Sequence, residues 1–171
     1  EKDLNKAISA EQFENPTILE FLNLNEFQTA WQSEAYRPLV NWDHVHCSHE
    51  AKASLNNNKE ADSKVISSIF PRLKQWALRD AQQTRVVITD QQGTEYTVQP
   101  LTEYNPVKGQ AIQINQNYPE LDPIELYAWF LGMNINWRGR GIFLDYYMTF
   151  PVAYPIEVKD KILASFRRGL M

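Results

Sequence analysis

The chain has 171 residues, of which 43% are hydrophobic and 12% aromatic, and it carries a formal net charge of −4 at pH 7. That length fits one domain with a single core, and the apolar content argues against a disordered chain. The acidic balance gives no electrostatic basis for binding nucleic acid, and no apolar run approaches the roughly 20 residues of a membrane-spanning helix. A single cysteine excludes an internal disulfide framework and fits a reducing compartment, so we expect a cytoplasmic location.

The first half of the chain predicts short helices and one strand. Residues 14–32 carry an approximate helical stripe of apolar side chains, and residues 36–47 alternate in part and hold β-formers, which favours a short strand. Ser48 is expected to cap a short helix that starts with HEAKASL. Residues 64–79 repeat apolar positions at helical spacing, with Pro71 as a kink or a fresh start.

The second half predicts a hairpin, two helices and a buried strand. Asp90–Gly93 is expected to form the turn between two strands. Asp122 is the expected cap of a helix with Pro123 in its first turn, which ends at Gly132 or at the RGRG that follows. GIFLDYYMTFP, at residues 141–151, is a nearly continuous run of large β-formers and predicts a strand buried on both faces. An amphipathic helix is expected from Pro155 onwards.

The densest group of potential ligands is DHVHCSHEA, which holds all three histidines and the only cysteine. Such side chains can bind zinc, or can pair a cysteine nucleophile with a histidine base. On a strand, however, His44 and His46 point to one face and Cys47 to the other. The group converges only if the chain bends so that His49 closes it. We therefore expect a strand-to-helix corner, and leave a metal site and a thiol enzyme as alternatives.

The carboxyl end of the chain resembles a known family. MTFPVAYPIEVKDKILASFRRGL is similar to the strand, proline and helix ending in glycine–leucine of heat-shock chaperone ATPases of the DnaK type, which belong to the actin-like ATPase superfamily. Upstream, CSHEAKASL, IFPRLKQWAL and RVVITDQQGTEYTVQP follow the order of that family's strand-to-helix start, its segment with a phenylalanine and a lysine, and its small sheet. Within the superfamily the chain resembles a diverged bacterial relative of the SrfB virulence-factor kind.

This resemblance implies an α/β fold in which residues 37–171 form part of an actin-like ATPase lobe, namely a peripheral α+β subdomain plus one core strand and helix. Residues 1–36 would be an N-terminal helical segment without a clear counterpart. The superfamily binds ATP and Mg between two lobes, but the glycine-containing phosphate loops of that site are missing from this sequence. The resemblance thus implies an internal fragment that contributes one edge of the nucleotide cleft, is not active alone, and has the rest of the parent ATPase and protein partners as its partners, with no nucleic acid and no membrane.

Three residues fall on family positions. Lys74 lies near the lysine that reaches the γ-phosphate, where a positive charge would offset that of the transferring phosphoryl group, and is the candidate catalytic residue. Pro151 matches the proline that couples nucleotide state to the partner domain. Lys159 takes the place of the relay arginine, whose planar fork a lysine lacks. Solvated helix lysines and a proline that merely ends a strand are the alternatives.

Two further hypotheses belong to other classes. One is a stand-alone α+β interaction module without catalysis. The other is a small metal- or thiol-dependent enzyme built on residues 43–49. The basic groups RGRG and FRR could contact an acidic partner, but we expect ordinary loop and helix-end charge there, since cations near a helix C-terminus favour the helix dipole.

Overall fold

The computed structural model describes residues 15–33, 42–61, 68–79, 83–102, 104, 120–139 and 145–170. In chain order its elements are β1 (Leu19–Phe21), α1 (Leu24–Ser33), β2 (Val45–Cys47), α2 (His49–Ala61), β3 (Ile69–Phe70), the 3-10 helix η2 (Leu73–Leu78), β4 (Val86–Thr89), β5 (Glu95–Val98), α3 (Pro123–Gly139) and α4 (Ile156–Leu170). Helices and small antiparallel sheets occur together, so the α/β class is confirmed. The actin-like part of that expectation stays a prediction.

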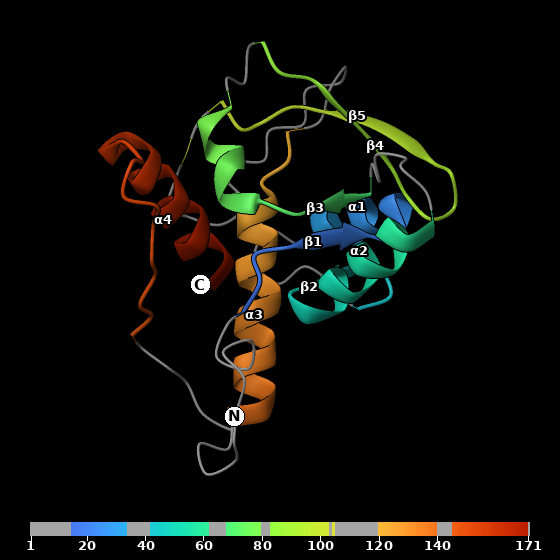
Figure 1. Cartoon of the computed structure of the whole chain (residues 1–171), viewed down its shortest axis with the longest axis horizontal. Coiled ribbons are helices and arrows are strands. Elements are labelled where there is room, and N and C mark those ends of the chain that lie inside the picture. The colour runs from blue at the N-terminus through green and yellow to red at the C-terminus, as the bar shows by residue number, and fades with distance from the viewer. Residues whose placement is uncertain are drawn as a thin grey trace.

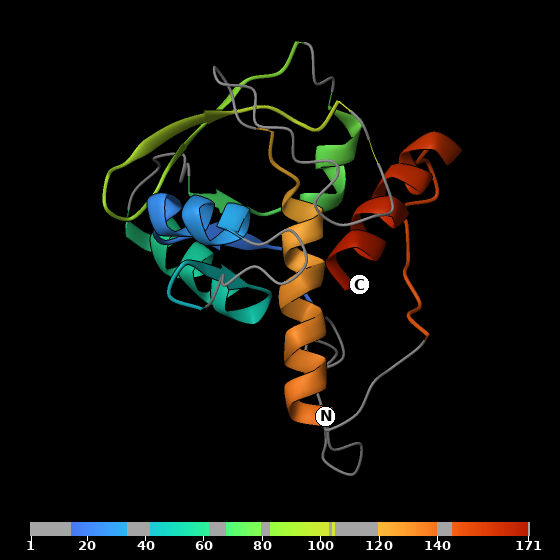
Figure 2. The same cartoon turned by 180° about the vertical axis from the view of Figure 1, so that it is seen from behind.

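Helix α3 is the central element of the molecule (Figure 1). The helix α4 packs along one side of α3, and the small sheet with α1 and α2 lies on the other side, as the reverse view also shows (Figure 2). The short helix η2 lies against both α3 and α4. Of the helices described, none has the length and apolar character that crossing a membrane requires.

The three-stranded sheet has the order β2-β1-β3, with antiparallel pairing throughout. The central strand β1 comes from the N-terminal segment, where residues 14–32 were expected to form one broken helix. Their described part is instead a strand followed by α1, with Asn23 accepting a hydrogen bond from the N–H of Glu26 at 3.1 Å. On β1, Leu19 pairs with Cys47 of β2 on one side and with Phe70 of β3 on the other. Such tertiary pairing overrides a weak helical pattern.

The helical stretch expected over residues 64–79, with Pro71 as a kink or a fresh start, is wrong for the described residues before Pro71 and is a 3-10 helix after it. Ile69 and Phe70 form β3, and Leu73–Leu78 form a 3-10 helix. Pro71 separates the two, because its ring and missing N–H prevent a helix from running through it. The rings of Phe70 and Trp76 then meet edge to face with centroids 5.3 Å apart. Residues 64–67 lie outside the described residues.

The predicted hairpin is confirmed. Strands β4 and β5 pair in antiparallel register, and the N–H of Gly93 donates to the carbonyl of Asp90 across the turn at 3.1 Å. Gly93 has a φ of +81°, a conformation that favours glycine. The Asp90 carboxylate accepts hydrogen bonds from the N–H groups of Gln92 and Thr94 within the turn, and from Leu24 at the start of α1, each at 2.9 Å. The turn is thereby tied to the N-terminal helix.

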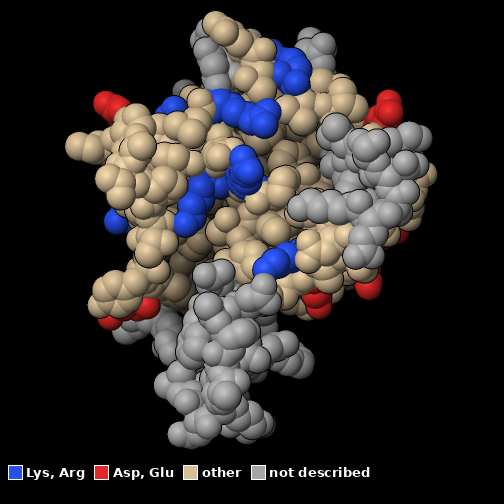
Figure 3. Space-filling model, viewed as in Figure 1, with Lys and Arg blue, Asp and Glu red and all other residues tan. Residues whose placement is uncertain are grey.

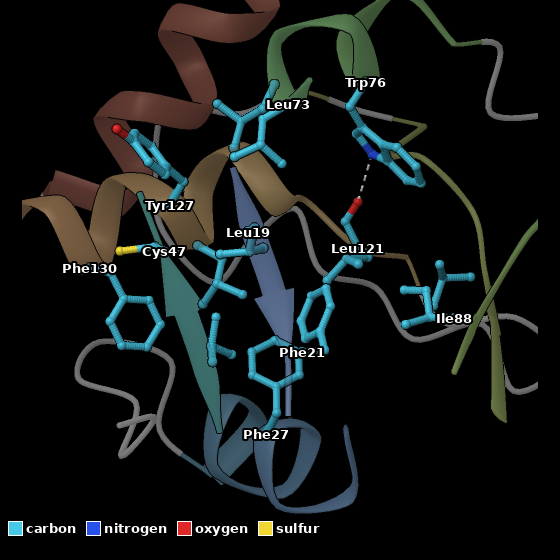
Figure 4. Close-up of a cluster of buried hydrophobic side chains, with 14 of the residues drawn as sticks. Leu19, Phe21, Phe27, Cys47, Leu73, Trp76, Ile88, Leu121, Tyr127 and Phe130 are labelled. Atoms are coloured by element: carbon cyan, nitrogen blue, oxygen red, sulfur yellow. Dashed lines mark hydrogen bonds between the residues drawn. The ribbon is translucent and has the colours of Figure 1, made fainter. Parts of the chain in front are cut away.

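One hydrophobic core joins both sides of α3 (Figure 4). The indole N–H of Trp76 donates to the carbonyl of Leu121 at 3.1 Å, which satisfies a polar group inside this core. The largest fully buried apolar side chains are Tyr127, Phe21, Phe130, Leu19, Leu24, Leu73, Ile88, Ile124, Leu126 and Ile162.

Both predicted helix starts in the C-terminal half are confirmed. Oδ1 of Asp122 accepts the N–H of Ile124 at 3.0 Å and of Glu125 at 3.2 Å, which caps α3. Helix α4 begins directly after Pro155. At its far end Gly169 lies so close to α3 that a Cβ there would be 2.3 Å from the carbonyl oxygen of Glu125. The absence of a side chain at this position therefore permits the two helices to cross.

The strand expected to be buried on both faces, over residues 141–151, is wrong for its described part. Residues 145–150 are extended but belong to no sheet, and Tyr147 is 98% exposed. No other strand lies along this stretch among the described residues, so its backbone has no ladder and its apolar side chains have no second layer to bury them. Residues 141–144 lie outside the described residues.

Candidate functional site

The side chains of the histidine and cysteine cluster do not converge on one point. Nε2 of His44 lies 3.4 Å from Oε2 of Glu26 on α1, whereas Nδ1 of His46 lies 3.2 Å from Oε2 of Glu20 on β1. The two histidines thus contact carboxylates on different elements. In the described part of the chain, no three His, Cys, Asp or Glu side chains form a group that could hold a metal ion.

Cys47 lies at the end of β2 and its side chain is buried. Burial raises the pKa of the Cys47 thiol to about 12, and the negative charge of Glu50 adds to the effect. Because the thiolate is the nucleophile, a cysteine in this state is chemically inert at neutral pH. The geometry gives no support to the thiol-enzyme alternative.

The strand-to-helix corner expected at this cluster is confirmed. Strand β2 ends at Cys47 and α2 begins at His49, so that only Ser48 separates the two elements. Ser48 has a φ of +58°, and its carbonyl accepts the N–H of Lys52 at 3.0 Å in the first turn of the helix. The Ser48 N–H donates to the carbonyl of Ile18 at 3.0 Å, which holds this left-handed corner against the neighbouring strand.

The most deeply buried charges lie between α3 and α4. Nε of Arg168 donates to Oε2 of Glu125 at 2.9 Å, and the second arm of the guanidinium bonds to Asp122. Oγ of Ser165 also contacts this guanidinium at 3.3 Å. All four residues are buried. The FRR motif is therefore not all surface charge as expected, because Arg168 reaches back from the last turn of α4 to the first turn of α3.

This buried ion-pair cluster joins two helices. Arginine is the suitable cation because its planar fork can bond two carboxylates at once. The arrangement fixes the crossing of α3 and α4, and the charges of Asp122 and Glu125 also favour the N-terminus of α3. Sequence reasoning assigned Asp122 only a capping role, since nothing in the local pattern links it to a residue 46 positions away.

Lys74, the candidate catalytic residue, lies on η2 and not on an α-helix. Its ammonium donates a hydrogen bond of 2.6 Å to the backbone carbonyl of Thr149. Partial burial lowers the pKa of Lys74. Thr149 precedes Pro151 by two positions in the chain. The hydrogen bond therefore brings Lys74 close to Pro151, another of the predicted site residues. Their roles stay predictions.

Pro151 and Lys159 lie at either side of the turn that leads into α4. The carbonyl of Pro151 accepts the N–H of Tyr154 at 3.1 Å, and the N–H of Lys159 bonds to the carbonyl of Pro155 at 3.2 Å. Pro151 is exposed and Lys159 is partly exposed. The relay role assigned to both by resemblance is not tested by these contacts.

The most exposed apolar side chains of the described chain lie in residues 145–156. Tyr147 is 98% exposed, Val152 97% and Ile156 74%, compared with 50% for Val87, the next most exposed large apolar side chain. Sequence reasoning missed this surface because the same residues suit a buried strand. We call residues 145–156 the exposed segment. In Figure 1 this segment runs up to α4 at the margin of the molecule.

One face of this acidic protein is basic. Figure 3 shows Lys and Arg side chains gathered over η2 and α4, whereas Asp and Glu side chains lie toward the rim of the same view. Residues 68–79 contain Arg72, Lys74 and Arg79, and no acidic residue. Arg72 and Arg79 are exposed.

Comparison of the chain with protein-family models, with curated proteins and with solved structures gives no match.

Proposed function

We propose that this chain is a non-catalytic module that binds protein partners through the exposed segment. The single observation that carries this proposal is the exposure of Tyr147, Val152 and Ile156 on one short stretch. Single exposed apolar residues are ordinary, but a group of them next to a polar rim is typical of an interaction surface. Aromatic side chains in particular contribute strongly to binding when a partner buries them.

The chemistry of the remaining candidates supports binding over catalysis. Cys47 is a buried thiol, and His44 and His46 each contact a separate carboxylate. In the buried cluster, the guanidinium of Arg168 pairs with the carboxylates of Asp122 and Glu125 and so joins α4 to α3. A single free cysteine, buried in the core, also supports our proposal of a cytoplasmic location.

The parent-ATPase hypothesis is a second candidate, because a specific feature favours it. Residues 145–150 are extended, are followed by Pro151 and precede α4, as the resemblance to the chaperone ATPases requires of a core strand and helix. This stretch has no partner strand among the described residues. A core strand separated from the other strands of its parent sheet would look the same. ATP and Mg would belong to that parent, with Lys74 directed at phosphate and Pro151 and Lys159 at the partner lobe. On this hypothesis the isolated chain gives no heat of binding in isothermal titration with Mg-ATP, and a saturable heat of binding would contradict it.

The docking proposal can be tested without knowing the natural partner. A random peptide library is selected on the immobilised protein, and each enriched peptide is then measured against three variants: Tyr147→Ser, Val152→Ser and the control Val87→Ser. We expect enriched peptides that bind the wild type and the Val87→Ser variant equally, and the two segment variants about tenfold more weakly, as for loss of one interface anchor. Peptides that bind all variants equally would reject the segment as the docking surface.

A further inference from the structure

We propose that the partner binds the exposed segment as an added β-strand, and that this partner strand carries acidic side chains. The inference rests on the proposed docking function and specifies its ligand. It is carried by three properties of the segment: its free backbone, its one-sided packing and its basic surroundings.

The backbone of residues 145–150 runs extended toward α4 (Figure 1) and makes no backbone–backbone hydrogen bond with the rest of the described chain. Within the described chain, the one backbone group of this stretch with a partner is the carbonyl of Thr149, which accepts the Lys74 ammonium. A row of unpaired N–H and C=O groups is the template on which a second extended chain adds as a strand. A helix or a folded surface would leave these groups without partners.

The side chains of the stretch leave one side open. Met148 and Phe150 are partly buried and pack against the hydrophobic core, whereas Asp145, Tyr146, Tyr147 and Thr149 are exposed. The stretch is thus fixed at its second half by two side chains, and the strand alternation holds only from Tyr147 to Phe150. Because Met148 and Phe150 anchor the stretch, a partner strand meets an edge that is already extended, and less ordering entropy opposes binding.

Basic side chains lie beside the second half of the segment, near Thr149, whereas Asp145 at its start is acidic and exposed. The hydrogen bond from Lys74 to Thr149 places η2 directly beside the segment, and Arg72 and Arg79 flank this helix. Figure 3 shows this basic surface continuing over α4. Opposite charge across an interface speeds association and suppresses wrong partners. A strand that alternates apolar and acidic residues would place the former on Tyr147 and the latter near the basic face.

The probes are three blocked eight-residue peptides. The first alternates valine and glutamate, the second alternates valine and lysine, and the third is the valine–glutamate peptide with every second amide N-methylated. Each is titrated into the whole ¹⁵N-labelled chain, with the amide signals of residues 145–150 as the readout. We expect saturable binding of the first peptide and at least tenfold weaker binding of the other two. The first peptide should also bind the Arg72→Gln, Arg79→Gln double variant more weakly, with a smaller salt dependence.

Equal binding by all three peptides, or shifts that avoid residues 145–150, would overturn the strand proposal. This failure is distinct from failure of the docking function. If library selection yields Tyr147-dependent peptides that bind as helices or carry basic residues, the docking surface stands and strand addition is rejected. If selection yields no peptide that depends on Tyr147 or Val152, and the valine–glutamate peptide does not shift the amides of residues 145–150, both the docking surface and strand addition are rejected.

Discussion

Nε of Arg168, in the last turn of α4, lies 2.9 Å from Oε2 of Glu125, in the first turn of α3, and neither side chain has any exposed surface. This pair, with the bond from the same guanidinium to Asp122, fixes where α4 lies. The exposed segment leads directly into α4. The buried charges therefore also determine where the candidate docking surface ends, which connects the stability of the helix pair to the proposed function.

Replacing Arg168 should destabilise the protein strongly. The Arg168→Met variant leaves Asp122 and Glu125 buried without a counter-charge, and breaking a buried pair in this way costs about 3–5 kcal/mol. The control is Arg167→Met at the exposed neighbouring position, where we expect a change within about 0.5 kcal/mol. Urea unfolding followed by tryptophan fluorescence measures both. Similar small losses in both variants would contradict a buried ion pair.

The two helix glycines should respond differently to alanine. A Cβ at Gly169 would lie 2.3 Å from the Glu125 carbonyl oxygen and 2.6 Å from Cβ of Ala128, so Gly169→Ala must push α4 away from α3. We expect a loss of about 1–3 kcal/mol, as for overpacking of a core. A Cβ at Gly132 meets only the flexible end of Leu170, at 3.1 Å. There the gain in helix propensity of about 1 kcal/mol should make Gly132→Ala neutral or stabilising, and thermal unfolding measures the order.

Asp90 should make stability depend on acid pH. Burial opposes ionisation of its carboxyl group, but hydrogen bonds from the N–H groups of Leu24, Thr94 and Gln92 outweigh burial and lower the pKa. A lowered pKa means that the stabilisation is complete above the unfolded pKa of about 4 and is lost as the pH falls through the folded value. The free energy of unfolding of the wild type should exceed that of Asp90→Asn by about 1–3 kcal/mol at pH 6. The difference should become progressively smaller below about pH 4. A difference that is constant from pH 6 to pH 3 would show that the charge has no part in this turn.

Cys47 should be unreactive in the native protein. With a buried thiol and a pKa near 12, the thiolate needed for reaction is scarce at pH 8. We expect a thiol-specific chromogenic disulfide to label Cys47 slowly in buffer, and fully within minutes in 6 M guanidinium (about the concentration that unfolds most domains). Native labelling at the rate of a free cysteine would instead favour the thiol-enzyme hypothesis.

Local signals in the sequence predicted several elements correctly. The Asp90–Gly93 turn, the Asp122 cap and the start of α4 after Pro155 each depend on residues within a few positions of one another, and the structure has all three. The strand-to-helix corner at residues 43–49 was expected from strand geometry and from the family resemblance, and the structure has it. The expected cap is wrong, because Oγ of Ser48 is buried without a hydrogen-bond partner in the described part of the chain. Steric and capping rules act over this short range, so a sequence reveals them.

Elements that depend on distant partners were missed. β1 exists because β2 and β3 flank it, and Arg168 is buried because Asp122 and Glu125 lie across a helix crossing. Residues 145–150 have the composition of a buried strand, but composition does not tell whether a neighbouring strand is present. The candidate site was overlooked for the same reason. Residues 145–150 are exposed because no strand of the described chain pairs with them, and the local sequence does not reveal this.

The central claim is that the exposed segment has a free, extended edge, and amide hydrogen exchange of the whole chain tests it most directly. We predict that the amides of residues 145–150 exchange at close to the rates of an unstructured peptide, because the hydrogen bond from Lys74 uses the carbonyl of Thr149 and not its N–H. The amides of α3 near Gly169 should instead be protected to the level of global unfolding. Strong protection of residues 145–150 in the free protein would mean that this backbone is already paired. That result would contradict both the docking surface and strand addition.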